Sequence, residues 1–225
     1  MIDRNSLKFH FSFGFKEDYE EKTPLVTLDS NNVYELGSLT RENAKDMLPS
    51  YESLRGNLEF SVVVDVSTAD GHSLFRSAVS PGTSAINDWS IVENRKAAIS
   101  YRCSSYVLQG EVKSEQISSS PKQISRHLPK FRHYGGAVPI FIEGVHFPVA
   151  CLTIDGNNPE YDHYIAMRSL QQFAKRQRDE RQKVQTREQQ QRDEEIARQV
   201  SNKLEEEKNA RRLDGGAWEL FHPDS

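Results

Sequence analysis

Residues 60–66, Phe-Ser-Val-Val-Val-Asp-Val, decide the fold class because they form the clearest buried strand in the chain. The dipeptide Asp70-Gly71 follows as a turn signal, and residues 73–79 form a second strand-like run. The two runs predict an antiparallel hairpin. A second hairpin is expected from the apolar runs at residues 137–142 and 147–154.

Helices are expected between and after these hairpins. Asp29 or Ser30 can cap a helix that carries Val33, Leu36, Thr40 and Met47 at helical spacing, and residues 86–101 form a second amphipathic stretch. Residues 25–28 are read as a short strand, and residues 111–129 as irregular. This order of elements predicts an α+β fold in which an antiparallel β-sheet is flanked by helices.

A long charged helix is expected to extend from this core towards the C-terminus. Asn158 is a suitable N-cap and Pro159 stands at the favoured first helical position. Large apolar residues support the helix as far as about Phe173 and then nearly vanish, and Gly215-Gly216 is the expected end. We expect a solvated helix supported by weak acid–base pairs. A coiled coil is the alternative, although Ile196, Val200 and Leu204 keep no heptad seam.

The chain therefore divides into four predicted parts. These are a flexible N-terminal arm (1–22), an α+β domain (23–173), a charged helical extension (174–212) and a C-terminal tail (213–225). In the arm, residues 8–15 alternate phenylalanine with other residues, as an edge strand or an extended peptide on a groove would.

Composition excludes several classes of protein. The net charge is −4, and the bases of the extension are interleaved with acids, so nucleic-acid binding is not expected. Two cysteines, Cys103 and Cys151, in apolar contexts cannot build a disulfide framework. Neither a signal peptide nor an apolar run long enough to cross a membrane is present, so we expect a cytoplasmic protein.

Several short motifs occur in a recognisable order. They are Pro81-Gly82-Thr83, Asn87-Asp88-Trp89, Arg95-Lys96, Ser104-Ser105-Tyr106, His133-Tyr134-Gly135-Gly136-Ala137-Val138-Pro139-Ile140 and Asp162-His163. Over about residues 25–173 the chain resembles uncharacterised protein family 0303 in its fungal form, a branch of the haem-degrading-like (GlcG/HbpS-like) superfamily.

This resemblance implies an antiparallel sheet backed by helices, assembled into a homo-oligomer in a soluble cytoplasmic protein. The superfamily name implies haem or small-ligand binding, but the motifs supply no obvious axial ligand. Members of the fungal branch are linked to the delivery of membrane proteins through cytosolic chaperone factors. Fold is transferred more safely than function between such relatives.

The residues themselves offer one candidate ligand pocket. In it, Arg95 or Lys96 would receive an anionic group, Trp89 would form an apolar wall, and the glycine pair would expose backbone N–H groups. The alternative is that Trp89 belongs to the core and the two bases are solvated or pair with acids. The full set of candidate residues is Asn87, Trp89, Arg95, Lys96, His133, Gly135, Gly136 and His163.

No catalytic motif and no metal site are expected. Glu160 and His163 have the spacing of half a di-iron site, but no second copy exists, so capping and a polar contact are the favoured roles. Ser104-Ser105 lacks the glycines of a nucleophile elbow.

Apolar residues return at the C-terminus as Trp218, Leu220 and Phe221. They could dock back on the protein or bind a helical-repeat chaperone adaptor. We therefore expect a non-enzymatic, oligomeric binding or adaptor protein that acts with cytosolic chaperone factors in targeting membrane proteins to the endoplasmic reticulum. The alternative is binding of haem or of a small anionic ligand in the core; no other cofactor is expected.

Overall fold

The computed structural model describes residues 23–55, 61–80, 85–109, 135–156 and 158–221, with the side chains of 50–55, 85–86 and 211–221 excepted. The predicted N-terminal arm, the stretch 111–129 and His133 lie outside these residues. The elements, in chain order, are α2 (Ser30–Arg55), β1 (Val63–Thr68), β2 (Ser73–Ala78), α3 (Ala85–Tyr101), β3 (Ala137–Ile140), β4 (Ala150–Asp155) and α5 (Pro159–Phe221).

The four strands form one antiparallel sheet in the order β2-β1-β4-β3. β1 pairs with β2 and β3 pairs with β4, so both predicted hairpins are confirmed. β1 also pairs with β4 across the whole of its length, which joins the two hairpins. The predicted α+β class is confirmed, with helices that flank an antiparallel sheet and a long C-terminal helix.

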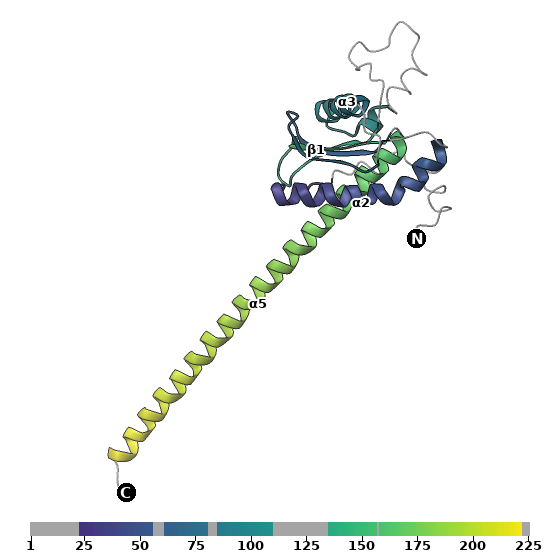
Figure 1. Cartoon of the computed structure of the whole chain (residues 1–225). Coiled ribbons are helices and arrows are strands. Elements are labelled where there is room, and N and C mark those ends of the chain that lie inside the picture. Colours follow the sequence, from purple (N-terminus) through teal and green to yellow (C-terminus); the bar gives the residue numbers. More distant parts are fainter. Residues whose placement is uncertain (1–22, 56–60, 81–84, 110–134, 157, 222–225) are drawn as a thin grey trace. The chain divides into compact units, whose positions relative to one another are not determined.

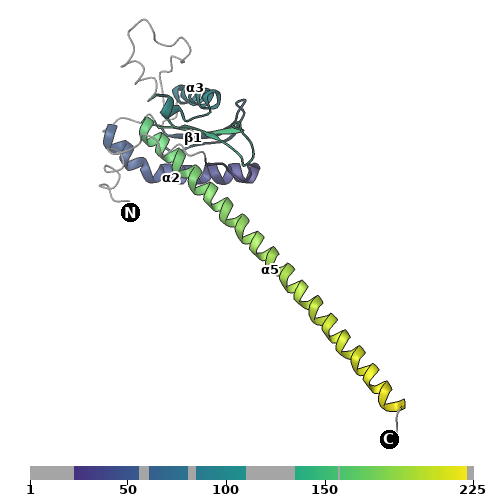
Figure 2. The ribbon, with the colours of Figure 1, turned by 180° about the vertical axis from the view of Figure 1, so that it is seen from behind.

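The helices cover both faces of the sheet, and Figures 1 and 2 show α2 and α3 on opposite sides of it. Successive side chains of each strand point to opposite faces of the sheet, so the strand residues alternate between the two layers. Val64, Val66, Leu152 and Ile154 pack in the main core with apolar residues of α2 and of the start of α5. On the other face, Ala98 of α3 packs with Ala137 and Cys151 in a smaller cluster.

Side-chain caps fix where two of the helices begin. Asp29 Oδ1 accepts a hydrogen bond from Asn32 N at 2.9 Å, and Asn32 Oδ1 accepts one from Asp29 N at 3.3 Å. Asn158 Oδ1 likewise accepts from Tyr161 N at 3.0 Å at the start of α5. Both N-termini therefore begin as the sequence predicts, since these side chains satisfy amides that have no partner within the helix.

The prediction of a strand over residues 25–28 is wrong. Leu25 forms only an isolated parallel bridge with Ile142. The next amide, Val26 N, donates to Gln177 Oε1 at 2.8 Å instead of to a neighbouring strand. A glutamine side chain from α5 has taken the place of a β-ladder partner.

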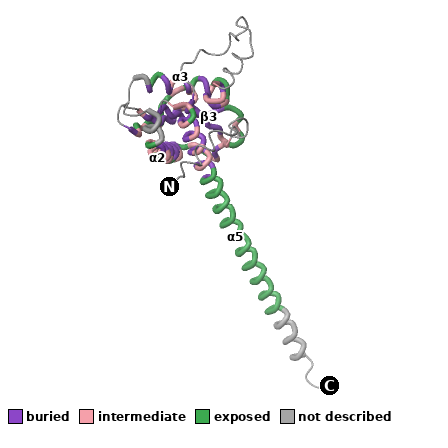
Figure 3. Tube along the Cα trace, turned by 90° about the vertical axis from the view of Figure 1, so that its right-hand side faces the viewer, coloured by how far each residue is buried: buried purple, intermediate pink, exposed green. Residues whose placement is uncertain are grey.

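α5 continues beyond Gly215-Gly216, where the sequence predicts its end, to Phe221. A glycine costs a helix only about 1 kcal/mol, and the next proline stands at position 223. The structure divides into two compact units, Met1–Gln177 and Arg178–Ser225, close to the predicted boundary at residue 173. From 178 to 210 every residue is exposed (green in Figure 3). No helix in the described part of the chain is long and apolar enough to cross a membrane.

Candidate functional site

The sheet face towards α3 carries polar residues where a sheet buried under a helix normally carries apolar ones. Asp65, Ser67, Thr153 and Asp155 all point to this side and are buried, because they alternate with the core valines and leucines. Among the described residues, Asp65 Oδ1 and Ser67 Oγ have no hydrogen-bond partner. Burying a polar group costs free energy unless it is hydrogen-bonded. The hydrogen-bond partners of the remaining buried polar residues therefore show whether this layer has a structural or a binding role.

Asp155, at the end of β4, is held by α3. Its Oδ2 accepts a hydrogen bond from Asn87 Nδ2 at 2.6 Å, and its Oδ1 accepts one from Ser90 Oγ at 3.2 Å. Asn87 Oδ1 in turn accepts from Ser61 Oγ at 2.6 Å. The predicted ligand residue Asn87 therefore joins α3 to the end of β4 and to Ser61, which precedes β1.

The glycine pair lies beside this network and has a steric reason for being glycine. Gly135 and Gly136 have φ values of 129° and 83°. A Cβ at Gly135 would lie 2.4 Å from Pro159 Cα, and one at Gly136 would lie 2.0 Å from Ile154 O. These two positions let the chain enter β3 directly against the first turn of α5.

A serine oxygen binds the backbone N–H groups that the sequence predicts to bind an anion. Ser105 Oγ accepts hydrogen bonds from Gly135 N at 3.3 Å and from Ala137 N at 3.2 Å, and Ser105 is fully buried. Asn94 Nδ2 donates to Gly135 O at 3.1 Å. The backbone groups of Gly135 are thus used within the protein, and binding of an outside anion there stays a prediction.

His163, on the first turns of α5, is 2% exposed and stacks on Tyr106, with ring centroids 4.8 Å apart. Burial lowers the pKa of His163 to about 4, so the imidazole is neutral at physiological pH. Within the described residues its Nδ1 has no hydrogen-bond partner. The preceding carboxylate, Asp162, accepts a hydrogen bond from Gly156 N at 3.0 Å and so ties the end of β4 to α5.

The other three described candidates lie elsewhere on α3. Arg95 Nη1 donates to Gly71 O at 3.4 Å, in the β1–β2 turn. Lys96 is exposed and pairs with Glu93 at 3.0 Å, and Trp89 is 48% exposed rather than part of the core. The structure therefore brings together Asn87, Gly135, Gly136 and His163 but not Trp89, Arg95 and Lys96.

Sequence reasoning missed the residues that organise this layer, namely Ser105, Tyr106, Asn94 and Asp155. Ser105 and Tyr106 were noted only as part of a family motif. The sequence does hold a signal for these residues, because a polar residue at a strand end or on the apolar face of a helix needs a hydrogen-bond partner. The partners are far apart in sequence, however, as with Asn94 and Gly135 or Ser105 and Ala137.

The chemistry available to this layer is limited. Burial raises the pKa of the Cys151 thiol to about 12, so it stays protonated and behaves as a small apolar side chain. Burial likewise raises the pKa of Tyr106, with Glu160 adding to the effect. Among the described residues, no group of three or more histidine, cysteine, aspartate or glutamate side chains could hold a metal ion.

The model of the family described as haem degrading protein HbpS-like matches residues 39–171, more than half of the chain. The chain belongs to the HbpS-like family. Its match begins inside α2 and ends inside α5, so it takes in all four strands and the buried polar layer, whereas residues 172–225 lie beyond it.

Individual proteins are similar to this chain over most of its length. The UPF0303 protein YBR137W of Saccharomyces cerevisiae is 32% identical over 158 residues, which covers 70% of this HbpS-like chain and 82% of the yeast protein. The crystal structure of Ybr137w is similar with a TM-score of 0.60 and 28% identity, and the match covers 78% of this chain and 99% of that one. The crystal structure of a PduOC–haem complex has a TM-score of 0.47 and 18% identity, and the match covers 66% of this chain and 95% of that one.

Proposed function

We propose that this protein is a non-enzymatic, homo-oligomeric adaptor of the cytoplasm. Its HbpS-like domain would assemble into an oligomer, and its C-terminal extension would bind a helical-repeat chaperone adaptor during targeting of membrane proteins to the endoplasmic reticulum. The observation that carries the proposal is the extension itself. It is helical and exposed from residue 178 to 210 and lies outside the residues that the family model matches.

The described apolar side chains of the extension support a role in binding a partner rather than in forming a hydrophobic core. Val184, Ile196, Val200 and Leu204 are each about half exposed, although apolar side chains of this size are usually buried when they serve a core. The helix then continues to Phe221 through the positions of Trp218 and Leu220. Aromatic anchors such as tryptophan carry much of the binding free energy at protein interfaces, and helices bind apolar grooves through apolar anchors a few residues apart.

The buried polar layer supports a structural role for the core. Asn87, Asn94 and Ser105 each hold two segments together through bonds within the protein. A reacting substrate would need such groups to be accessible. We therefore assign the core to stability and assembly, and the extension to recognition.

Binding of a purified helical-repeat co-chaperone, measured by fluorescence anisotropy, tests the proposal. We expect the full chain to bind, and both a truncation after Arg212 and the triple variant Trp218→Ala, Leu220→Ala, Phe221→Ala to bind at least about tenfold more weakly. Glu219→Ala is the matched control and should bind as the full chain does. Equal affinity of the truncated and full chains would rule out the tip as the binding element.

Oligomerisation would increase the avidity of such a tip by presenting several copies together. Light scattering coupled to size-exclusion chromatography gives the mass of the particle directly. A particle of 25.8 kDa, the mass of one chain, would contradict the homo-oligomeric part of the proposal.

Haem or small-anion binding in the core is the second candidate, because the family description names haem degradation and His163 has an unpartnered Nδ1 among the described residues. The described histidines do not fit a haem site as they stand. His163 is buried and stacks on Tyr106, His72 is exposed between β1 and β2, and His146 is exposed in a bend. A haemin titration of the full chain and of His133→Ala and His163→Ala tests this candidate. A saturable Soret change that either substitution abolishes would support it, and no such change would exclude haem.

A further inference from the structure

Two buried polar atoms on the α3 face of the sheet have no hydrogen-bond partner among the described residues. They are Asp65 Oδ1 and Ser67 Oγ, on residues that are 1% and 0% exposed. Both residues lie on β1, and the unbroken pairing of β1 with β4 keeps their side chains on one face. A buried polar atom without a partner is costly, the more so when it carries charge. Both atoms are therefore candidates for binding a ligand.

The buried carboxylate lies close to the protein surface at the turn between β1 and β2. Ser73, the first residue of β2, is exposed, and its Oγ donates a hydrogen bond to Asp65 Oδ2 at 2.7 Å. This hydrogen bond places the Ser73 side chain on the α3 face, although the pairing of β1 with β2 shifts register at this point. Asp65 is thus a single hydrogen bond away from an exposed side chain.

A partly buried base from α3 lies over the same turn. Arg95 Nη1 donates to Gly71 O at 3.4 Å, and this is its one hydrogen bond within the part of the chain that the structure describes. A Cβ at Gly71 would lie only 2.6 Å from Arg95 Nη2, so the guanidinium sits directly against the turn. A guanidinium has five N–H groups, and most of those on Arg95 remain for another acceptor.

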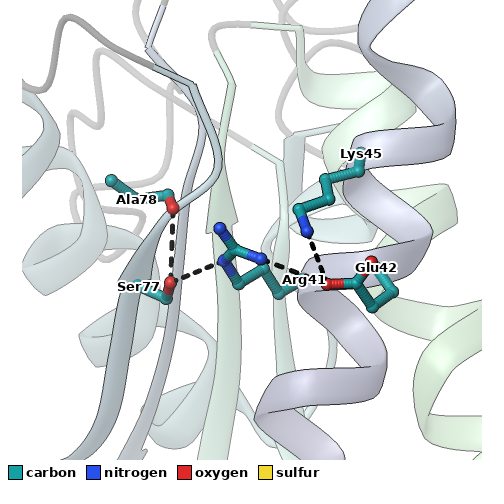
Figure 4. A network of polar contacts seen from close by, with 5 residues as sticks. All are labelled: Arg41, Glu42, Lys45, Ser77 and Ala78. Atoms are coloured by element: carbon teal, nitrogen blue, oxygen red, sulfur yellow. Dashed lines mark hydrogen bonds and ion pairs between the residues drawn. The ribbon is translucent and has the colours of Figure 1, made fainter.

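Other basic side chains around β2 have acidic partners. Figure 4 shows Arg41 Nη1 and Lys45 Nζ both bound to Glu42 Oε1, at 3.1 and 2.7 Å. Arg76, which lies on β2 opposite the buried carboxylate, forms an ion pair with Asp88. The arginine over the turn differs from these bases, because its hydrogen bond goes to a neutral carbonyl.

Asp65 and Arg95 both lie near the thiol of Cys151. Burial is the main cause of the raised pKa of this thiol, and a hydrogen bond with Thr153 opposes it. Beyond these two effects, the negative charge of Asp65 raises the pKa of Cys151 and the positive charge of Arg95 lowers it. Two opposite charges thus act on one side chain, yet within the described ranges no ion pair joins them.

The two charged groups need opposite kinds of partner. Asp65 Oδ1 accepts hydrogen bonds most strongly from a cationic donor, and the spare N–H groups of Arg95 suit a carboxylate. A metal cation would satisfy only Asp65, and the nearby guanidinium would repel it. We propose that a small zwitterion of the α-amino-acid class binds between β1 and α3, with its ammonium group on Asp65 and Ser67 and its carboxylate on Arg95. Arg95 then binds an anionic group, as the sequence predicts.

Isothermal titration calorimetry of the full chain with glycine, L-alanine and L-serine tests this inference. Ethylamine and acetate are the matched probes, because each carries only one of the two charges. We expect an amino acid to bind, and both probes to bind at least about tenfold more weakly through loss of charged hydrogen bonds. Ethylamine that binds as tightly as the amino acid would overturn the proposal. No saturable heat with any of the three amino acids would overturn it too, and would leave ordered water as the partner of Asp65.

Two variants locate the site. Asp65→Asn removes the charge but keeps the shape of the side chain, and Arg95→Gln removes the guanidinium at a partly buried position. Each should weaken binding of the amino acid at least about tenfold. Arg95→Gln alone decides the test if Asp65→Asn does not fold, as judged by circular dichroism.

Glu42→Gln and Lys45→Gln are the matched controls. They change the net charge by the same amounts on α2, which covers the opposite face of the sheet, and should bind the amino acid as the full chain does. Equal binding by the site variants and the controls would overturn the proposal. None of these outcomes depends on the adaptor role, since no variant changes the extension.

Discussion

At the scale of the residue, Gly136 has the least room for a side chain among the described glycines. Its φ of 83° lies in the left-handed region, and its missing side chain makes room for Ile154 O and Asp162 Cβ. Gly136 O also accepts a hydrogen bond from Ile154 N at 2.9 Å. β3, the end of β4 and the start of α5 thus meet at a place where no Cβ fits.

Gly136→Ala should therefore lower the free energy of unfolding by about 3 kcal/mol or more, because backbone strain and a steric clash add together. Gly144→Ala is the matched control. Its φ is 79°, but a Cβ there would meet nothing within 4 Å, so only the left-handed penalty of about 1 kcal/mol applies. Urea denaturation measures both, and equal losses would show that the clash at Gly136 is relieved by movement of its neighbours.

His163 should make stability depend on pH. Its pKa is lowered to about 4 in the folded protein from 6.5, so between these values the unfolded chain binds more protons. The stability associated with His163 is complete above pH 6.5 and is lost as the pH falls towards 4. At pH 4.5 the loss should be on the order of 2–3 kcal/mol.

His163→Phe keeps a ring against Tyr106 but removes the titration. The difference in unfolding free energy between pH 7 and pH 4.5, measured with urea, should be smaller in this variant by about that amount. The same pH dependence in both proteins would assign the acid sensitivity to other groups.

At the scale of the element, α5 combines a core helix with a polar one. Its first turns bury Ile165, Leu170 and Phe173, and Gln177 is buried just before the exposed stretch 178–210. Gln177 Oε1 accepts from Val26 N and its Nε2 donates to Thr27 O at 2.9 Å. One side chain therefore fastens the segment that leads into α2.

Gln177→Ala should lower the free energy of unfolding by about 1–2 kcal/mol, because two part-buried hydrogen bonds to the backbone of Val26 and Thr27 are lost. Gln182→Ala, on the exposed part of the same helix, should change it by less than about 0.5 kcal/mol. Thermal or urea unfolding of both variants provides the measurement. A cost at Gln182 equal to that at Gln177 would contradict the assigned role.

At the scale of the whole molecule, the HbpS-like domain and the extension differ in what stabilises them. The domain, up to Gln177, has two apolar clusters on opposite faces of its sheet. In its described part, residues 178–210, the extension is exposed and has side-chain contacts along its own helix, such as Gln189 with Asp193 at 2.8 Å and Arg192 with Gln189 at 2.9 Å. Pairs of this kind contribute only about 0.2–0.5 kcal/mol each.

A truncation after Gln177 should consequently unfold at the same urea concentration as the full chain, within error, because residues 178–210 bury nothing. The helical circular dichroism signal per chain should fall by the share that the extension contributes. Circular dichroism followed during urea titration checks both expectations. A clear loss of stability on truncation would show that the extension contributes to the stability of the domain.

The sequence by itself determined the local features of this protein. It placed both hairpins, the caps at Asp29 and Asn158, and the change of α5 from an apolar to a charged helix, since each depends on residues close together in the chain. Only the tertiary structure decided which polar groups meet. Ser105 Oγ accepts a hydrogen bond from Gly135 N, Asn87 binds Asp155, and Gln177 binds the backbone of Val26 in place of a neighbouring strand. These partners are separated by 30 to 151 positions, and periodicity and capping rules act only over a few turns or strands.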